Sequence, residues 1–501
     1  MANLFDTLSA RFPADLSRPF AWLEDGTLVS YGDMIAGSAR YANALRERGV
    51  SIGDRVMVQT PKSIDMLMLY LATLRAGAIF VPLNPAYTAG ELAYFIEDAE
   101  PTLFVCDPAR RDEIAGLAPA LTVETLGENG AGSLAQMAAD LPGDWATVSR
   151  EDDDLAAILY TSGTTGRSKG AMLSHGNLAS NALTLVDHWR FTADDVLLHA
   201  LPIFHTHGLF VGTNVTLAAG SSMIFHNRFD ADAVMAALPR ATTMMGVPTF
   251  YIRLLAEPTF DRNHVGHMRL FVSGSAPLSA EIHREFEGRT GHAILERYGM
   301  TETNMNTSNP YDGDRIAGTV GMPLPGVTIR IADPETGRVL PQGEVGVIEI
   351  AGPNVFKGYW RKPEKTAEEF RGGHFISGDL GFIDGLGYVS IVGRAKDLII
   401  AGGYNIYPAE VEAALDELPQ IHESAVVGVP HRDLGEGVVA AVVARDPSFA
   451  DEGAIIAALA DKLARFKQPR RVYFLPELPK NTMGKVQKTS LREMFGDAFK
   501  G

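Results

Sequence analysis

The chain has 501 residues, 46% of them hydrophobic, and its 44 Lys and Arg are outnumbered by 61 Asp and Glu, which gives a formal net charge of −17. That length supplies enough chain for a large core and roughly three domains. The acidic balance argues against a nucleic-acid partner, because nucleic-acid-binding surfaces are strongly basic.

The N-terminal segment lacks a cationic stretch followed by an apolar one, and the most apolar stretch, Met66–Leu83, is interrupted by Arg75. We therefore expect no export signal and no membrane span. The single cysteine, Cys106, permits no intramolecular disulfide and is expected to fill space in the core. These features predict a cytoplasmic protein.

Short apolar runs rich in β-branched residues alternate with helical stretches along much of the chain. Strands are expected at Arg55–Val58, Ile79–Val81, Leu103–Val105, Val196–Leu198 and Leu270–Val272, and helices at Asn177–Trp189 and Ala280–Phe286. The Gly-rich segment Gly127–Gly132 is expected to be a surface loop. This alternation predicts an α/β fold built from stacked, mainly parallel sheets.

The segment Tyr160–Gly170, YTSGTTGRSKG, follows an apolar strand-like run and combines Ser and Thr hydroxyls, three glycines and two cations in eleven residues. Glycines let backbone N–H groups turn toward an anion, and Lys169 adds charge, so a nucleoside triphosphate is the expected guest. Ser168 stands where a P-loop requires its second glycine, which argues against an ordinary P-loop NTPase.

Five further segments follow in order: GSAPL (Gly274–Leu278), YGMTE (Tyr298–Glu302), SGDLG (Ser377–Gly381), GRAKDLIIAGGYNIYPAEVE (Gly393–Glu412) and PKNTMGKVQK (Pro479–Lys488). With them the chain resembles the acyl-adenylate-forming enzymes, which include acyl-CoA synthetases, luciferases and peptide-synthetase adenylation domains. The departures from the usual motifs, at Ser168, Ser377 and Met483, remove no charged catalytic group.

The resemblance implies a large N-terminal domain (residues 1–393) of stacked, mainly parallel sheets that binds ATP and the acid. A small, mobile α/β C-terminal domain (residues 394–501) would swing over it about a hinge at Lys396. The sequence by itself favours a plain exposed surface lysine at Lys396.

In this family a carboxylate attacks the α-phosphorus of ATP, so cations and a metal should converge where charge develops. The resemblance implies that Lys485 and Thr301 act on the α-phosphate and that Glu302 binds Mg²⁺. Asp379 would hold the ribose with help from Arg394. The implied ATP-binding residues are Thr161, Ser162, Gly163, Thr164, Thr165, Gly166, Lys169, Ser275, Ala276, Pro277, Arg297, Tyr298, Gly299, Met300, Thr301, Asp379, Arg394 and Lys485.

CoA, the second co-substrate, would then reach the acyl-AMP through a tunnel that the resemblance assigns to Gly402, Gly403 and Tyr404. The segment Lys462–Arg492 holds nine Lys or Arg and one acid, Glu477. Such a run is most often a solvated helical face. Beside the Gly484–Lys485 motif we favour a face that meets nucleotide or CoA phosphates.

Two arginines bear on the identity of the acid: Arg297, directly before YGMTE, and Arg253, after GVPTFYI. A buried arginine is costly unless an anion pairs with it, which suits the second carboxylate of a dicarboxylic acid. With PIFHTHGL these features resemble malonyl-CoA synthetases, which implies that Arg253, Ser275 and Arg297 bind the unreacted carboxylate beside His207. A structural pairing of Arg297 with Glu296 or another acid is the alternative, and packing or capping competes with ligand contact for His205 and His207.

The sequence therefore favours ATP-dependent ligation of malonate, and also methylmalonate, to CoA through an acyl-AMP. A ligase for another small or medium aliphatic acid, a catalytically decayed nucleotide-binding module and an adenylation domain serving a carrier protein stay open. Small molecules are the expected partners, together with a lysine acetyltransferase and deacetylase acting on Lys485, since acylation would neutralise its charge.

Overall fold

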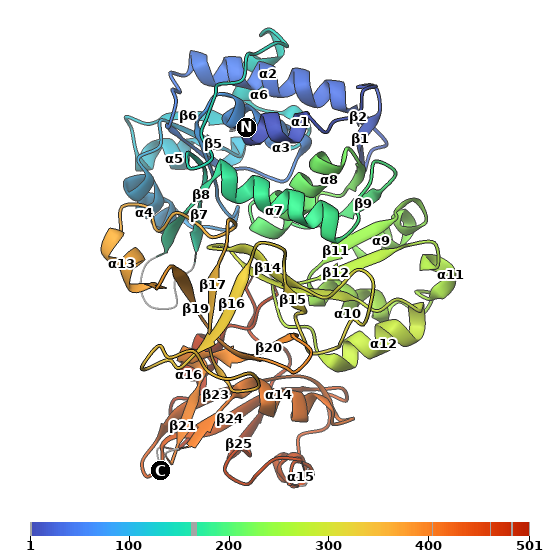
Figure 1. Ribbon diagram of the computed structural model, residues 1–501, viewed down its shortest axis with the longest axis vertical. Coiled ribbons are helices and arrows are strands. Elements are labelled where there is room, and N and C mark those ends of the chain that lie inside the picture. Colours follow the sequence, from blue (N-terminus) through green and yellow to red (C-terminus); the bar gives the residue numbers. More distant parts are fainter. Residues whose placement is uncertain (1–2, 162–167, 403, 461, 482–483, 500–501) are drawn as a thin grey trace.

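The computed structural model describes residues 3–161, 168–402, 404–460, 462–481 and 484–499. In Figure 1 the N-terminal layers of sheet and helix lie at the top, and a smaller C-terminal unit lies at the bottom. Within the described ranges no helix has both the length and the apolar composition that a membrane crossing requires.

A six-stranded sheet has the order β6-β5-β3-β4-β7-β8, parallel except for the antiparallel pair β7–β8. Its strands are β3 (Arg55–Gln59), β4 (Ile79–Pro82), β5 (Leu103–Cys106), β6 (Thr122–Thr125), β7 (Leu155–Thr161) and β8 (Lys169–Ser174). Cys106 is fully buried in this sheet, as expected. The chain between β7 and β8 carries the predicted phosphate loop.

A nine-stranded sheet has the order β15-β14-β13-β12-β11-β9-β10-β1-β2 and is parallel from β13 through β1. Its strands are β1 (Pro19–Leu23), β2 (Leu28–Ser30), β9 (Val196–His199), β10 (Ser222–Phe225), β11 (Thr243–Gly246), β12 (Leu270–Ser273), β13 (Leu295–Met300), β14 (Asn304–Ser308) and β15 (Met322–Pro323). The stacked, mainly parallel architecture predicted from the sequence is confirmed.

Helices cover these two sheets, and one hydrophobic cluster joins residues of both, among them Val56, Phe80, Leu197 and Met223. The helices are α1 (Leu4–Ser9), α2 (Tyr31–Glu47), α3 (Ile64–Arg75), α4 (Ala89–Ala99), α5 (Arg111–Leu117), α6 (Ser133–Ala139), α7 (His175–His188), α8 (Asn214–Ala219), α9 (Ala231–Ala237), α10 (Pro248–Ala256), α11 (Arg262–Val265) and α12 (Ala280–Thr290). The expected loop at Gly127–Gly132 contains a short 3₁₀ turn at Glu128–Gly130.

An antiparallel sheet lies between these layers and the C-terminal unit (Figure 1). It contains β16 (Thr328–Ala332), β17 (Gly346–Ala351), β18 (Phe370–Arg371), β19 (His374–Ile383) and β20 (Val389–Arg394), with α13 (Pro363–Glu368) beside it. Strand β20 crosses the predicted domain boundary after residue 393, and a 3₁₀ turn at Ala395–Asp397 follows it. The boundary itself stays a prediction.

The C-terminal sheet has the order β22-β21-β24-β23, with β25 paired to β24. Its strands are β21 (Ile399–Ala401), β22 (Tyr404–Ile406), β23 (Ile421–His431), β24 (Gly435–Ala444) and β25 (Arg471–Phe474), and its helices are α14 (Pro408–Asp416), α15 (Glu452–Ala458) and α16 (Lys488–Phe495). It has its own hydrophobic cluster, centred on residues such as Ile406, Val426 and Ala440.

Candidate active site

Arg297 carries a buried positive charge at the carboxyl end of the nine-stranded sheet. It lies on β13, is 4% exposed, and packs so closely on Gly274 that a Cβ there would lie 2.6 Å from its Nε. Within the described chain its Nε and Nη2 have no hydrogen-bond partner. Burial lowers the pKa of Arg297 to about 9, which leaves the guanidinium charged at neutral pH. A buried cation without a counter-charge points to an anionic ligand.

Glu296 is not the partner of Arg297. Neighbouring residues of a strand point to opposite faces, and Glu296 is held instead by the backbone of Gly318 and Leu278. Burial raises the pKa of Glu296 to about 8, and its Oε1 has no partner among the described residues. The structural alternative considered for Arg297 is therefore wrong.

Ser275 and His207 lie close together beside this cation. The Oγ of Ser275 lies 3.2 Å from Nδ1 of His207, and Ser275 has a φ of 71°, a conformation that non-glycine residues rarely adopt. Burial, reinforced by the charge of Arg297, holds the pKa of His207 well below its ordinary value, so the ring is neutral. His207 begins a π-helix, His207–Thr213, a distortion that is frequent at functional sites.

Tyr298, Asp379 and Arg394 form a connected group on β13, β19 and β20. The hydroxyl of Tyr298 donates to Oδ2 of Asp379 at 2.6 Å, and Nε of Arg394 lies 2.9 Å from Oδ1. The carboxylate is 4% exposed and keeps further lone pairs on both oxygens. The structure thus brings together the residues predicted to hold the ribose.

Lys485 reaches this group from the C-terminal unit. A Cβ on the preceding Gly484 would lie 3.0 Å from Cγ2 of Thr249, so the segment rests on the N-terminal layers. Lys485 keeps part of its surface open to solvent, but desolvation, together with the charge of Arg394, lowers its pKa to about 8. Desolvation, with the charges of Arg297 and Lys485, lowers the pKa of His205 to about 4. The charge of Lys485 therefore acts both on Arg394 of the ribose group and on His205 beside the acid pocket.

Glu302 belongs to a network that sequence analysis missed. The hydroxyl of Tyr359 lies 3.0 Å from Oε1 of Glu302 and 2.7 Å from Oε2 of Glu369. Nζ of Lys169 lies 2.8 Å from Oε1 of Glu369 and 4.0 Å above the Tyr359 ring. Burial raises the pKa of Glu302. The expected metal ligand is thus connected to the lysine of the phosphate-loop segment, through residues that lie outside every recognised motif.

Arg253 does not lie in a dry pocket with Arg297, as the sequence analysis expected. It is exposed in the last turn of α10, with its guanidinium 6.0 Å above the ring of Phe229. Its role in binding the acid stays a prediction. The remaining described candidates lie at or just after strand ends: Thr161 ends β7, Ala276 and Pro277 follow β12, Gly299 and Met300 end β13, and Thr301 follows it.

Gly402 and Tyr404 contact other residues of the C-terminal unit. The N–H of Gly402 donates to the carbonyl of Leu434 at 2.9 Å, and the exposed ring of Tyr404 stacks on Phe466 with centroids 4.7 Å apart. Lys396 is exposed in the 3₁₀ turn, where a hinge was expected. The candidates Ser162, Gly163, Thr164, Thr165, Gly166 and Gly403 lie outside the described residues.

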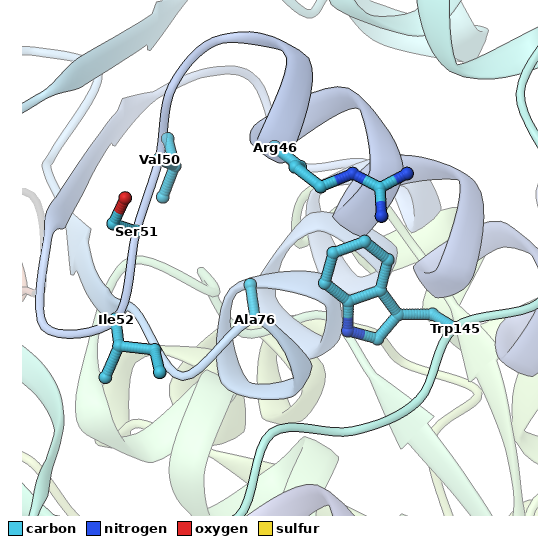
Figure 2. A pocket seen from close by; sticks show the side chains of 6 residues that line it. All are labelled: Arg46, Val50, Ser51, Ile52, Ala76 and Trp145. Atoms are coloured by element: carbon cyan, nitrogen blue, oxygen red, sulfur yellow. The ribbon is translucent and has the colours of Figure 1, made fainter.

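A hollow elsewhere on the surface lies between the C-terminal end of α2 and Trp145 (Figure 2). Its one cation, Arg46, lies 4.9 Å over the Trp145 ring and donates to Oδ1 of Asn43 at 2.7 Å. Because that guanidinium already has partners and none of the candidate residues lines the hollow, this is not the candidate site.

Comparison with known proteins assigns the family. Residues 9–360 match the AMP-binding enzyme family, and residues 410–485 match the AMP-binding enzyme C-terminal domain. The chain belongs to the AMP-binding enzymes. A feruloyl-CoA synthase from an Amycolatopsis species is 38% identical over 94% of this chain and 95% of its own. The mitochondrial malonate–CoA ligase of Mus musculus is 34% identical over 89% and 83%.

The crystal structure of ATP-bound MatB from Rhodopseudomonas palustris has 59% identity and a TM-score of 0.98 over 100% of both chains. The apo form of that protein, at 58% identity and the same coverage, has a TM-score of 0.87. The chain as a whole is therefore more similar in structure to the ATP-bound form of that relative than to its apo form.

The Tyr359 network makes a testable prediction. Tyr359→Phe removes the donor shared by two carboxylates, which should lower the free energy of unfolding by about 1–3 kcal/mol. Because Glu302 and Lys169 lose their common support, KM for ATP at fixed Mg²⁺ should rise several-fold. Tyr388→Phe is the matched control, since its hydroxyl donates to the carbonyl of Asp314 at 2.8 Å outside the site. A normal KM for ATP in Tyr359→Phe would contradict the role assigned to this network.

Proposed function

We propose that the protein ligates malonate to CoA, using ATP and releasing AMP and pyrophosphate through a malonyl-AMP intermediate. The observation that carries the proposal is the buried guanidinium of Arg297 beside Ser275 and His207, whose Nε and Nη2 have no partner among the described residues. A monocarboxylic acid spends its only carboxylate on the phosphorus, whereas malonate keeps a second one to pair with this cation. Guanidinium and carboxylate match in a two-bond geometry, which makes the pairing selective.

In the first step the reacting carboxylate attacks the α-phosphorus of ATP, and pyrophosphate leaves. Asp379, supported by Tyr298 and Arg394, accepts from the ribose hydroxyls. Lys485 brings a positive charge to the space between the ribose and the acid pocket, where negative charge builds up in the transition state. Thr301 lies in the turn after β13, and we assign it a contact with the α-phosphate.

Glu302 fits the proposed Mg²⁺ site, because a hard cation requires oxygen ligands and this buried carboxylate faces the phosphate-loop lysine through Tyr359 and Glu369. When bound, Mg²⁺ neutralises charge on the phosphates. The described residues contain no group of three or more His, Cys, Asp or Glu that could hold a metal. A metal at Glu302 would therefore be held largely by the phosphates of ATP.

The second step requires the C-terminal unit to move, because Lys485 occupies the approach to the acyl-AMP. We propose that the C-terminal unit turns about Lys396. This rotation brings Gly402, Gly403 and Tyr404 to the site, where they line the passage for the CoA thiol. The thiol then displaces AMP from the acyl group. One mobile unit would thereby serve both half-reactions.

Replacement of Arg297 tests the identity of the acid. Arg297→Ala should lower kcat/KM for malonate roughly 30-fold to several thousand-fold, because truncating one partner of a buried charge pair costs about 2–5 kcal/mol. Propionate has no distal carboxylate and should lose far less. The quantity to measure is the ratio of the two kcat/KM values at saturating ATP.

Arg253→Ala is the comparison variant. Because Arg253 is exposed, it should reduce that ratio much less than Arg297→Ala does. An equal fall for malonate and propionate in Arg297→Ala would mean that the arginine supports the fold or ATP, and the dicarboxylate assignment would fail in favour of another small or medium aliphatic acid.

The charge of Lys485 should give the first step an alkaline limit. Since the pKa of Lys485 is lowered to about 8 and the protonated form is the active one, kcat/KM for acyl-AMP formation should fall as pH rises through 8. Lys485→Arg, which stays protonated, should move that limb of the pH profile to higher pH.

Lys485→Ala should slow acyl-AMP formation roughly 100- to 1,000-fold and leave CoA capture of preformed malonyl-AMP intact. Equal losses in both steps would contradict the two-orientation scheme.

The hinge proposal has a kinetic test. Lys396→Pro fixes φ near the value that the present 3₁₀ turn requires, and so should hold the unit in its present orientation. Acyl-AMP formation should persist while CoA ligation falls steeply. Ligation at the wild-type rate would place the hinge elsewhere.

We propose further that a lysine acetyltransferase and deacetylase act on Lys485 in the cytoplasm. Acetylation removes the charge that the first step uses, so stoichiometrically acetylated enzyme should behave as Lys485→Ala does.

A further inference from the structure

The proposed reaction has three anionic substrates, and the residues described so far supply cations for two of them. The basic segment Lys462–Arg492 was favoured for the phosphates of CoA, but most of its cations are already engaged. Ion pairs hold Lys462 with Glu417, Lys467 with Glu410, Arg471 with Glu452, Lys480 with Glu423, Lys488 with Glu412 and Arg492 with Asp397. Any other cavity lined by cations is therefore a candidate for binding the CoA phosphates, because the chain as a whole has a net charge of −17.

Such a cavity lies where the two large sheets converge. It has a volume of about 280 Å³, and its lining follows the carboxyl ends of four parallel strands. Thr60 and Lys62 follow β3, Pro85 follows β4, Pro202 follows β9 and Arg228 follows β10. Carboxyl ends of parallel strands are where α/β proteins bind ligands.

Lys62 is the inner basic residue of this cavity, and burial lowers its pKa well below the ordinary value, so an anion is needed to hold its charged form. Its Nζ lies 3.0 Å from Nδ1 and 2.9 Å from the carbonyl oxygen of His199, and 4.3 Å from the centroid of the Phe225 ring. An ammonium has three donors, and among the described residues these two contacts are its hydrogen bonds. Glu24, whose charge reaches Lys62, is not within ion-pair distance of it in the described chain. One donor is left for an anion.

Arg228 and two aromatic rings form the outer part. Arg228 is exposed at the rim and has no hydrogen-bond or ion-pair partner within the described chain. The rings of Phe229 and Phe250 stack with centroids 4.1 Å apart, which gives the cavity an apolar wall beside its two cations. An apolar wall with a few convergent polar groups is typical of cofactor-sized sites.

One stretch of chain borders both the cavity and the acid pocket. Pro202 and Phe204 line it, and the same stretch of chain continues to His207 beside Ser275, five residues from Pro202 and at most about 18 Å away. Phe250 in the cavity wall follows Thr249, on which Gly484 rests. A ligand in the cavity would therefore extend toward the acyl group along the path that Lys485 leaves open when the C-terminal unit moves.

We propose that Lys62 and Arg228 bind phosphate groups of the nucleotide end of CoA, whose pantetheine arm then carries the thiol toward the acyl-AMP. This inference rests on the proposed function. A lysine ammonium binds phosphate as a point charge, and Arg228 adds a second cation at the rim. Lys62 and Arg228 are distinct from Arg297 and from the cations assigned to ATP, while Arg253 lies 6.0 Å over the Phe229 ring in the cavity wall.

The test compares thiols with and without phosphates. Arg228→Gln should raise KM for CoA about 3- to 10-fold, and Lys62→Gln about 10- to 100-fold, as expected for loss of a charge-assisted contact. With pantetheine, which has the same thiol arm and no phosphate, Arg228→Gln should match the wild type. Dephospho-CoA separates the two phosphate sources: equal losses for it and CoA assign the diphosphate, and a loss for CoA alone assigns the 3′-phosphate. Adenosine 3′,5′-bisphosphate should compete with CoA less well in the variant.

Arg240→Gln is the matched control. Arg240 precedes β11, at the amino end of the nine-stranded sheet, and its guanidinium lies 5.4 Å from the centroid of the Trp22 ring. It should leave KM for CoA unchanged. Malonate-dependent exchange between ATP and pyrophosphate, measured in wild type without CoA, tests the proposed function separately. If exchange is present but Arg228→Gln and Lys62→Gln have wild-type KM for CoA, the subsite is overturned. It is also overturned if they alter KM for malonate instead.

Discussion

The guanidinium of Arg297 lies on the backbone of Gly274, removed from water and without a protein counter-charge among the described residues. A folded chain tolerates such a group only if the surrounding structure compensates for its cost, and here the compensation is a ligand that supplies the missing anion. Binding of an anion by Arg297 explains several neighbouring features. Gly274 leaves room for the guanidinium, Ser275 accepts a backbone conformation with positive φ, and the π-helix brings His207 against its hydroxyl.

The positions of the other site residues follow from the separation between the Arg297 guanidinium and the ribose-binding group. Tyr298 directly follows Arg297 on β13, so one strand places the two groups on opposite faces of the same backbone. Lys485 comes from a separate unit, and desolvation together with the positive charge of Arg394 lowers its pKa to about 8. A charge supplied by a mobile unit can be present for one half-reaction and absent for the next. A charge fixed on the sheet could not.

The alternation of short strands and helices predicted the layered α/β architecture, because each apolar run expected to be a strand, such as Ile79–Val81, lies fully inside one. Motifs singled out Tyr298, Asp379 and Arg394, which the fold brings into contact, and their role toward ATP stays a prediction. Tyr359 and Glu369 were missed because their role comes from contacts 57 and 10 positions apart that no local pattern records. The exposure of Arg253 was not foreseen for a related reason: helix α10 turns it to solvent, and only tertiary packing decides which face of a helix is covered.

The account's central claim is that the acid pocket recognises a negative charge at the far end of the acyl group. The most direct measurement compares two non-hydrolysable acyl-sulfamoyl adenosines, one malonyl and one propionyl, for binding to the wild-type protein by calorimetry. They share the adenosine and differ in the distal carboxylate. The malonyl compound should bind about 10- to 100-fold more tightly, as a charge-assisted pair with Arg297 requires. Equal affinities, or tighter binding of the propionyl compound, would contradict the account.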